Sequence, residues 1–310
     1  MTKKKAIVTG GAGFIGSNLT AALVALGWET HIVDIDPSFR RESLPKEATL
    51  HIIDIRSTEK IRPVFEGADV VFHTAAKPRV SASVEFPIDT AEHNIIGTVS
   101  VLKAAVDAKV RRVIYSSSGS SYGDQDTLPL SEDMRANPVH PYGVQKYAGE
   151  LFTGIWPNVY GLETVSLRYF NVYGPGLDPN GPYALAVGRF ITARKEGKPI
   201  TIYGDGTVTR DFTHVRDVVR ANLLAAESTN VGKGEVINIG AGRNVTIQYL
   251  AEMFLPAGRQ AAGEIVYAPP RIEAHDSQAD NRKAKELLGW EPKERLEEGI
   301  AELKKEMGLS

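Results

Sequence analysis

The sequence contains no cysteine, and its charges nearly balance, with 36 Lys and Arg against 38 Asp and Glu. The missing thiols exclude disulfide bonds, thiolate metal sites and cysteine nucleophiles. The formal net charge is only −2 and is spread along the chain, so we expect neither nucleic acid nor a membrane surface as a partner. A reducing compartment suits such a chain, and we expect a cytoplasmic protein.

Long apolar runs are also missing. No stretch approaches the roughly 18 apolar residues that a membrane-spanning helix needs. The apolar run Ala6–Val8 behind the basic start is too short for a signal peptide. At 310 residues the chain exceeds what one core usually accommodates, so we expect a soluble protein with one large domain and a smaller lobe.

Short β-rich runs alternate with amphipathic helical segments through the first half of the chain. This alternation predicts an α/β fold with a Rossmann-type, doubly wound parallel sheet between layers of helices. The predicted strands are Lys5–Thr9, Thr30–Asp34, Leu50–Asp54, Asp69–Thr74, Val110–Ser116 and Thr164–Tyr169. The predicted helices are Ser17–Leu26, Thr58–Phe65, Ile95–Ala108 and Tyr142–Val159.

The local composition changes after Asn171, because Tyr173–Gly176 and Asp178–Pro182 are rich in turn-forming residues. We therefore assign residues 1–170 to the large domain, rejoined by about 211–240, and residues 171–210 and 241–310 to a smaller C-terminal α/β lobe. Regular structure is expected at Val187–Lys195, Ile200–Tyr203, Arg216–Ala226, Val236–Ile239, Thr246–Met253, Ile265–Ala268, Asn281–Leu288 and Glu297–Glu306.

A glycine pattern, Gly10-x-x-Gly13-x-x-Gly16, follows the first predicted strand and opens the first helix. In that context the glycines indicate a dinucleotide site. Gly10 allows a tight turn, Gly13 lets the backbone approach a pyrophosphate, and Gly16 lets the helix pack closely. The helix N-terminus then faces the negative charge.

An acidic residue, Asp34, ends the second strand 34 − 16 = 18 residues after the last glycine. It suits the adenosine 2′-hydroxyl and would repel a 2′-phosphate, which favours NAD over NADP. Arg40 and Arg41 are either solvated surface residues or phosphate ligands. Asp54, at the end of the third strand, either meets the adenine or is a polar strand cap.

Hydroxyl groups and a Tyr-x-x-x-Lys pair form the candidate catalytic site. Ser116–Ser118 ends the fifth strand, while Tyr142 and Lys146 lie one turn apart on the next helix. A neighbouring ammonium favours a phenolate and brings a phenol of pKa about 10 toward the range of general acid–base catalysis. The histidines show no metal-ligand spacing, so no metal is expected.

Together the motifs resemble the extended short-chain dehydrogenase/reductase family, and their order and spacing are similar to those of the UDP-galactose 4-epimerases. They cover essentially the whole chain. They are Gly10–Gly16, Asp34, Ser118, Tyr142-x-x-x-Lys146, Arg168–Asn171 and Arg210–Phe212.

The resemblance implies that Ser118 holds the sugar O4, Tyr142 is the acid and base, and Lys146 binds the nicotinamide ribose and tunes Tyr142. It implies an NAD site in the large domain formed by Gly10, Gly13, Phe14, Ile15, Gly16, Asp34, Asp54, Ile55, Ala75, Ala76, Asn94, Ser116, Tyr142, Lys146 and Phe170. It implies a UDP-sugar site formed by Pro78, Ser118, Ser120, Asn171, Ala184, Tyr203, Arg210, Arg271 and Ser277.

The implied reaction is epimerisation at C4. Tyr142 takes the O4 proton as the C4 hydride passes to NAD, the 4-keto sugar rotates, and the hydride returns to its other face, so NAD stays bound between turnovers. Related dehydratases need further acids beside the hydroxyl. Here Gly119 and Ser120 follow Ser118, which favours epimerisation.

Small residues at Ala184 and Ser277 resemble the subgroup that acts on UDP-N-acetylhexosamines, because UDP-glucose enzymes carry Asn and Tyr there. UDP-glucose/UDP-galactose and then UDP-glucuronate remain alternatives. Three departures from the pattern are Lys77–Arg79, Gly119 in place of Ser, and a shortened Arg271–Ala274. Arg79 could meet a uronic acid, and Glu273 could contact the uridine ribose.

A non-catalytic NAD-binding module is the rival interpretation. Such a module should have lost its acid and base, whereas Ser118, Tyr142 and Lys146 are all present. The resemblance also implies a homodimer that pairs through helices equivalent to Ile95–Ala108 and Tyr142–Val159.

Overall fold

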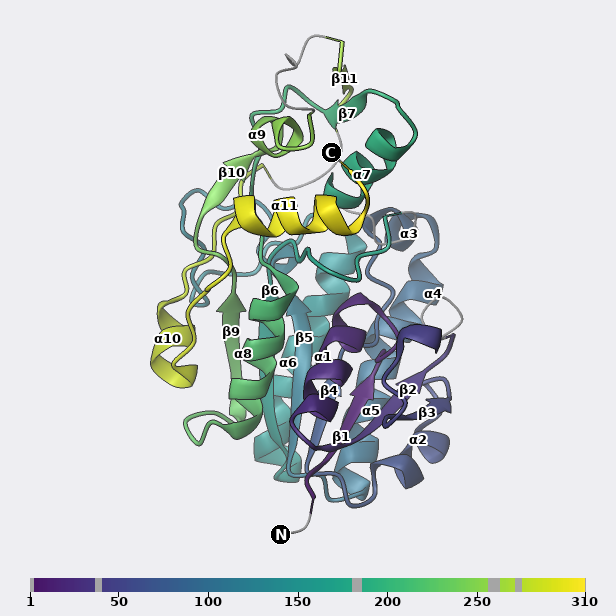
Figure 1. Cartoon of the computed structure of the whole chain (residues 1–310). Coiled ribbons are helices and arrows are strands. Elements are labelled where there is room, and N and C mark those ends of the chain that lie inside the picture. Colours follow the sequence, from purple (N-terminus) through teal and green to yellow (C-terminus); the bar gives the residue numbers. More distant parts are fainter. Residues whose placement is uncertain (1–2, 37–40, 180–185, 256–262, 271–274, 310) are drawn as a thin grey trace.

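The computed structural model describes residues 3–36, 41–179, 186–255, 263–270 and 275–309. Figure 1 shows a large α/β body with the N-terminus at its base and a smaller lobe above it that carries the C-terminus. Within the described ranges, no helix combines the length and apolar character that crossing a membrane requires.

A seven-stranded sheet forms the centre of the large body, in the order β3-β2-β1-β4-β5-β6-β9 with every pair parallel. The order reverses between β1 and β4, which is the point where such sheets bind ligands. The predicted Rossmann-type sheet is confirmed. Its strands are β1 (Lys5–Thr9), β2 (Glu29–Asp34), β3 (Thr49–Ile52), β4 (Val70–His73), β5 (Arg112–Ser118), β6 (Glu163–Tyr169) and β9 (Lys233–Ile239).

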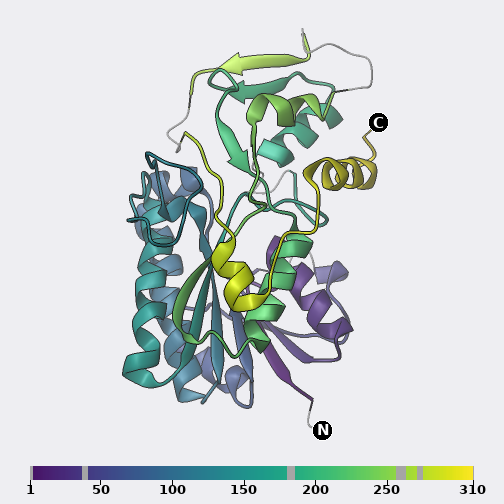
Figure 2. The same cartoon turned by 90° about the vertical axis from the view of Figure 1, so that its left-hand side faces the viewer.

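Helices cover both faces of this sheet, as Figure 2 shows edge-on. On one face α1 (Phe14–Ala25) and α8 (Val215–Glu227) bury Leu19, Leu23 and Val218. On the other face lie α2 (Thr58–Phe65), α5 (Gly97–Asp107) and α6 (Pro141–Tyr160). Because both faces are covered, the central strands are continuously apolar rather than alternating.

The smaller lobe has its own core, which includes Phe190, Phe254 and Ile300. The helix α10 (Arg282–Leu288) interrupts the C-terminal part of this lobe, because Ala284 and Trp290 pack into the core of the large body. The lobe elements are α7 (Ala186–Lys195), β7 (Ile200–Tyr203), β8 (Thr209–Asp211), β10 (Asn244–Thr246), α9 (Ile247–Glu252), β11 (Ile265–Ala268) and α11 (Leu296–Glu306).

Several elements differ from the sequence prediction. The helices α3 (Val80–Glu85) and α4 (Pro87–Ala91) were not predicted, and a π-helical turn, η2 (Glu92–Ile96), joins α4 to α5. The predicted strand start at Val110 is wrong, because β5 begins at Arg112. Lys109 ends the preceding helix with a positive φ of 56°, and Val110 N donates to Ala105 O.

Candidate active site

The glycine turn between β1 and α1 is a close-packed cradle. Gly10 has φ 68°, and a Cβ added there would lie 2.6 Å from the Cα of Ala75. A Cβ on Gly16 would collide with the carbonyl of Gly10, so the third glycine lets α1 pack on the turn itself. Only residues without a side chain fit at these two positions.

The N-terminus of α1 opens onto this cradle. Gly13 is its N-cap and supplies no side-chain acceptor, while Phe14, Ile15 and Gly16 form the first turn. A helix start without a side-chain cap leaves backbone N–H groups for an external anion. The turn therefore fits the pyrophosphate of a dinucleotide.

Asp34 stands at the end of β2 beside the same turn. Its Oδ2 accepts from Ala12 N at 3.0 Å, and its Oδ1 accepts from Asp36 N at 3.2 Å. Asp54 is held differently, because Arg56 pairs with its carboxylate at 2.6 Å and lowers its pKa by hydrogen bonding. Ile55 is buried, and a Cβ added to Gly97 would lie 2.7 Å from the Cδ1 of Ile55.

The loop after β4 reaches the cradle from the other side of the switch point. Ala75 packs on Gly10, and Ala76 follows it. Asn94, buried in η2, accepts from Lys77 N at 2.7 Å and donates to Lys77 O at 3.0 Å. The side chain thus clamps both backbone polar groups of Lys77, next to the partly buried Pro78.

The helix α6, which carries the candidate catalytic pair, begins beside η3 (Gly119–Ser121), the turn that follows β5. The backbone N of Tyr142 donates to Ser83 Oγ at 3.1 Å, which ties the helix start to α3. Lys146, one turn later, is buried and donates from Nζ to the carbonyl of Ser116 at 2.7 Å. Its ammonium also lies 4.9 Å from the centre of the Tyr115 ring.

Burial lowers the pKa of Lys146 to about 7, and the carboxylate of Glu150 opposes that shift. Glu150 is itself paired with Arg168 at 2.6 Å. Burial, and then the charge of Lys146, lower the pKa of His73 at the end of β4 to about 3. The amine therefore stands at the carboxyl edge of β4 and β5, beside the switch point.

Two of the predicted substrate residues have hydroxyl groups that are buried without a hydrogen-bond partner among the described residues, Ser120 Oγ and Ser277 Oγ. Buried polar atoms are normally satisfied, so these two suit a polar ligand. Ser118 Oγ accepts from Ser120 N at 3.2 Å. Ser277 N and Arg210 Nη1 both donate to Thr209 O, so Arg210 and Ser277 lie side by side.

Other predicted substrate residues are engaged within the protein. Asn171 Nδ2 donates to Asp211 O at 2.9 Å, and Tyr203 on β7 lies under the guanidinium of Arg189. Ala184 and Arg271, with Glu273 and Arg40, lie outside the described residues. Phe170 is buried, and a Cβ on Gly119 would lie 3.0 Å from its ring, so a side chain at that position would require the ring to shift.

The sequence did not single out Ser83, Glu150 or Gln145. Ser83 lies on an unpredicted helix, so nothing signalled its contact with Tyr142. Glu150 follows Lys146 by four residues, and that helical spacing was a usable signal. Gln145 is buried and bonded to Asn94, a pairing across 145 − 94 = 51 residues with no local signature.

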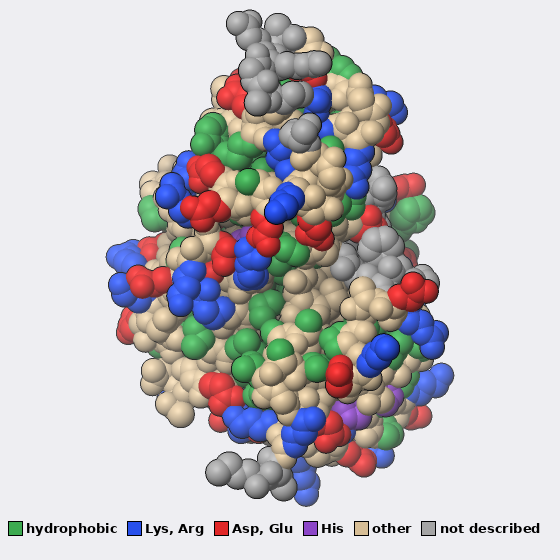
Figure 3. Space-filling view, in the orientation of Figure 1, with side chains coloured by type: hydrophobic (Ala, Val, Ile, Leu, Met, Phe, Trp, Pro, Cys, Tyr) green, Lys and Arg blue, Asp and Glu red, His purple; other side chains and the backbone are tan. Residues whose placement is uncertain are grey.

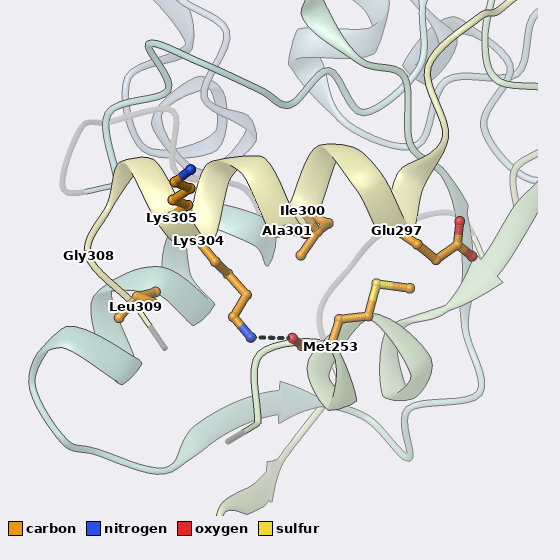
Figure 4. Close-up of a pocket in the computed structure, with 8 residues that line it drawn as sticks. All are labelled: Met253, Glu297, Ile300, Ala301, Lys304, Lys305, Gly308 and Leu309. Atoms are coloured by element: carbon orange, nitrogen blue, oxygen red, sulfur yellow. Dashed lines mark hydrogen bonds between the residues drawn. The ribbon is translucent and has the colours of Figure 1, made fainter. Parts of the chain in front are cut away.

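A separate cavity of 670 Å³ lies between α11 and the end of α9 (Figure 4). None of the predicted site residues lines it. Its lining residues are Met253, Glu297, Ile300, Ala301, Lys304, Lys305, Gly308 and Leu309.

A glycine cradle, a buried lysine and a tyrosine at the switch point of a parallel sheet define a nucleotide-cofactor enzyme of the Rossmann class. The family model for the "NAD dependent epimerase/dehydratase family" matches residues 6–240, and the chain belongs to that family. The predicted family, the NAD cofactor and the isomerase class are confirmed.

Relatives of known name cover nearly all of the chain. A UDP-glucose 4-epimerase of Mycolicibacterium smegmatis is 37% identical over 305 residues, 96% of each protein. The structure of a Thermotoga maritima UDP-glucose 4-epimerase with UDP-glucose is similar with a TM-score of 0.90 and 38% identity, covering 98% of this chain and 99% of that one. A Methanobrevibacter ruminantium UDP-N-acetylglucosamine 4-epimerase in complex with UDP-N-acetylmuramic acid gives 0.89 and 33%, covering 99% and 100%.

Proposed function

We propose that this enzyme is a UDP-sugar 4-epimerase that works through a 4-keto intermediate and prefers UDP-GlcNAc and UDP-GalNAc. One observation carries the proposal. The buried Nζ of Lys146 is fixed 2.7 Å from the carbonyl oxygen of Ser116 on β5, one helical turn from Tyr142, at the same edge of the sheet as the glycine cradle. Acid–base chemistry and a hydride carrier therefore meet at one place.

The residues around the cradle fit NAD. The turn excludes side chains at Gly10 and Gly16, α1 begins without a side-chain cap, and Asp34 stands beside the turn. When bound, NAD accepts and returns a hydride. In this proposal Asp34 takes the adenosine ribose and Asn94 fixes the loop of Ala75 and Ala76.

The chain's own residues move the proton. Tyr142 takes the proton from the sugar O4 and returns it after the keto sugar has turned. The ammonium of Lys146 favours the phenolate of Tyr142 and orients the nicotinamide ribose. Ser118, whose hydroxyl oxygen is held by Ser120 N, donates to O4 and positions the reacting carbon.

The preference for N-acetylated sugars rests on the small side chain at Ser277. Its hydroxyl is buried and unbonded among the described residues, next to Arg210. A larger side chain there would fill the space that we assign to a 2-acetamido group. UDP-glucose/UDP-galactose is the second candidate, and the exposed Arg79 at the N-cap of α3 keeps UDP-glucuronate as the third.

Ser277→Tyr tests the size of this pocket. We expect it to lower kcat/KM for UDP-GlcNAc and UDP-GalNAc about 100-fold and for UDP-glucose less than about threefold, because overpacking excludes only the larger substituent. Chromatography of the products gives both rates. Ser277→Ala is the control and should keep both activities; equal losses for the two sugar classes in Ser277→Tyr would refute the assignment.

A panel of UDP-GlcNAc, UDP-GalNAc, UDP-glucose, UDP-galactose and UDP-glucuronate tests the function itself. The purified protein should carry a dinucleotide visible in its absorption spectrum and should interconvert one C4-epimeric pair. Bound dinucleotide without turnover of any sugar would instead support the NAD-binding module.

A homodimer accounts for an apolar face that the single chain leaves exposed. Leu151, Ile155 and Val159 recur along α6 at helical spacing and are exposed, as is Ile96 at the end of η2. Contiguous exposed apolar side chains mark interaction sites. On the face seen in Figure 3, positive and negative side chains are intermixed, so that face shows no large patch of a single charge.

Leu151→Arg together with Ile155→Arg should convert the dimer to a monomer, because two charges would be buried unpaired in a self-complementary contact. The mass in solution, from light scattering after gel filtration, gives the result. Leu26→Arg, which replaces an exposed leucine at the end of α1, should leave the dimer intact. A wild-type protein of monomer mass would end this proposal.

A further inference from the structure

Gln145 lies between the two proposed catalytic residues in the sequence, but its side chain bonds to Asn94 and Thr90. It is 3% exposed. Its Oε1 accepts from Asn94 Nδ2 at 2.7 Å, and its Nε2 donates to Thr90 Oγ1 at 3.0 Å. Both ends of the buried amide are therefore bonded, to the π-helical turn η2 and to α4.

Gln145 completes the hydrogen bonding of the Asn94 amide. Asn94 Oδ1 accepts from Lys77 N, and Asn94 Nδ2 donates one hydrogen to Lys77 O and the other to Gln145. If the Asn94 amide were flipped, its Nδ2 would face the Lys77 N–H, so that two donors met. Its Oδ1 would face Gln145 Oε1, so that two acceptors met. Gln145 thus helps to select the one orientation that clamps Lys77.

The clamp continues to the cofactor cradle. Lys77 follows Ala75 and Ala76, and Ala75 is packed so closely on Gly10 that no Cβ fits between them. The π-helical turn that presents Asn94 is a rare local geometry that is frequent at functional sites. One continuous set of contacts therefore runs from the cradle through Lys77 and Asn94 to α6.

We infer that Gln145 is a positioning residue, which fixes the loop of Ala75–Lys77 relative to the helix face that carries Tyr142 and Lys146. This inference rests on the proposed function, in which the loop and the helix face must be held in a fixed position relative to each other. Burying a full amide is unfavourable unless it is bonded. Packing alone would be served by an apolar side chain of similar size, such as methionine.

Gln145→Met keeps the volume and removes both hydrogen bonds. We expect kcat to fall about tenfold with KM for the UDP-sugar within about twofold, because a small displacement at a reacting centre slows chemistry more than binding. In the purified holoenzyme, hydrogen exchange at the Lys77 amide should accelerate about tenfold, since its acceptor on Asn94 is no longer held.

Thr153→Val is the matched control. It removes the buried hydrogen bonding of the Thr153 hydroxyl, which lies 2.7 Å from Ser166 Oγ, two turns beyond the site on the same helix. It should lower the melting temperature about as much as Gln145→Met does, while kcat and the Lys77 exchange stay at wild-type values. Equal kinetic losses in both variants, or unchanged Lys77 exchange in Gln145→Met, would overturn the inference.

A double-mutant cycle tests whether Gln145 acts through Asn94. If it does, Asn94→Ala with Gln145→Met should be no slower than Asn94→Ala alone, whereas independent roles would multiply the two losses and refute the coupling. The exchange measurement needs no turnover. If the wild-type protein turned over no UDP-sugar but Gln145→Met still exchanged the Lys77 amide faster, the role of Gln145 in positioning the loop would stand and only the proposed reaction would be refuted.

Discussion

Tyr142→Phe is expected to lower the kcat of epimerisation about 10³-fold, within the range that general acid–base catalysis contributes. The variant removes only the hydroxyl, while the backbone N of residue 142 can still donate to Ser83. The fold and the bound dinucleotide should therefore be retained. Product chromatography gives the rate, and the dinucleotide released on denaturation gives the occupancy.

Tyr147→Phe is the control, because it makes the same change on the same helix one residue beyond Lys146. It should keep wild-type activity. If Tyr142→Phe retained more than about a tenth of the wild-type rate, the acid and base would have to be another group.

Lys146→Met should abolish turnover and at the same time stabilise the fold near neutral pH. Burial lowers the pKa of Lys146 from 10.5 to about 7, so between these values the unfolded chain binds more protons than the folded one. The free energy of unfolding of the wild type therefore rises as pH increases from about 7 to about 10.5, and the full penalty is present below about pH 7. That penalty is on the order of 4 kcal/mol.

Denaturant unfolding of both proteins, freed of dinucleotide, measures this difference. The variant should be more stable by about 2 kcal/mol near pH 7 once the lost bond to Ser116 is subtracted. The difference should shrink as the pH rises, reach zero at about pH 9 and be reversed by about pH 10.5, where only the loss of the bond to Ser116 remains. If the variant were less stable than the wild type at every pH, burial would not be destabilising the charged form of Lys146, and the lowered pKa would be contradicted.

The sheet was predictable because its central strands β1, β4, β5 and β6 are buried along nearly their whole length and alternate in the sequence with amphipathic helices. The same reasoning failed between Lys77 and Ile96, where two prolines divide the chain into short helices and a π turn hides the 3.6-residue repeat. The strands β8 and β10 are three residues long. A run of that length carries no alternation that a sequence could reveal.

The candidate catalytic pair could be recognised in the sequence because its spacing is local to one helix. Contacts between distant segments were not, and Gln145 with Asn94 is the main example. Asp54 was assigned to the cofactor and Asn171 to the substrate without knowledge of the contacts that their side chains make with Arg56 and with the carbonyl of Asp211. The close approach of the Phe170 ring to Gly119 is likewise visible only in three dimensions.

Retention of the C4 hydrogen tests the central claim most directly. UDP-GlcNAc carrying deuterium at C4 should give UDP-GalNAc that keeps this deuterium at C4, because the same hydride leaves and returns within one bound complex. The unlabelled sugar turned over in deuterium oxide should gain no carbon-bound deuterium. Exchange of the C4 label with solvent, or interconversion without dependence on Tyr142, would contradict the account.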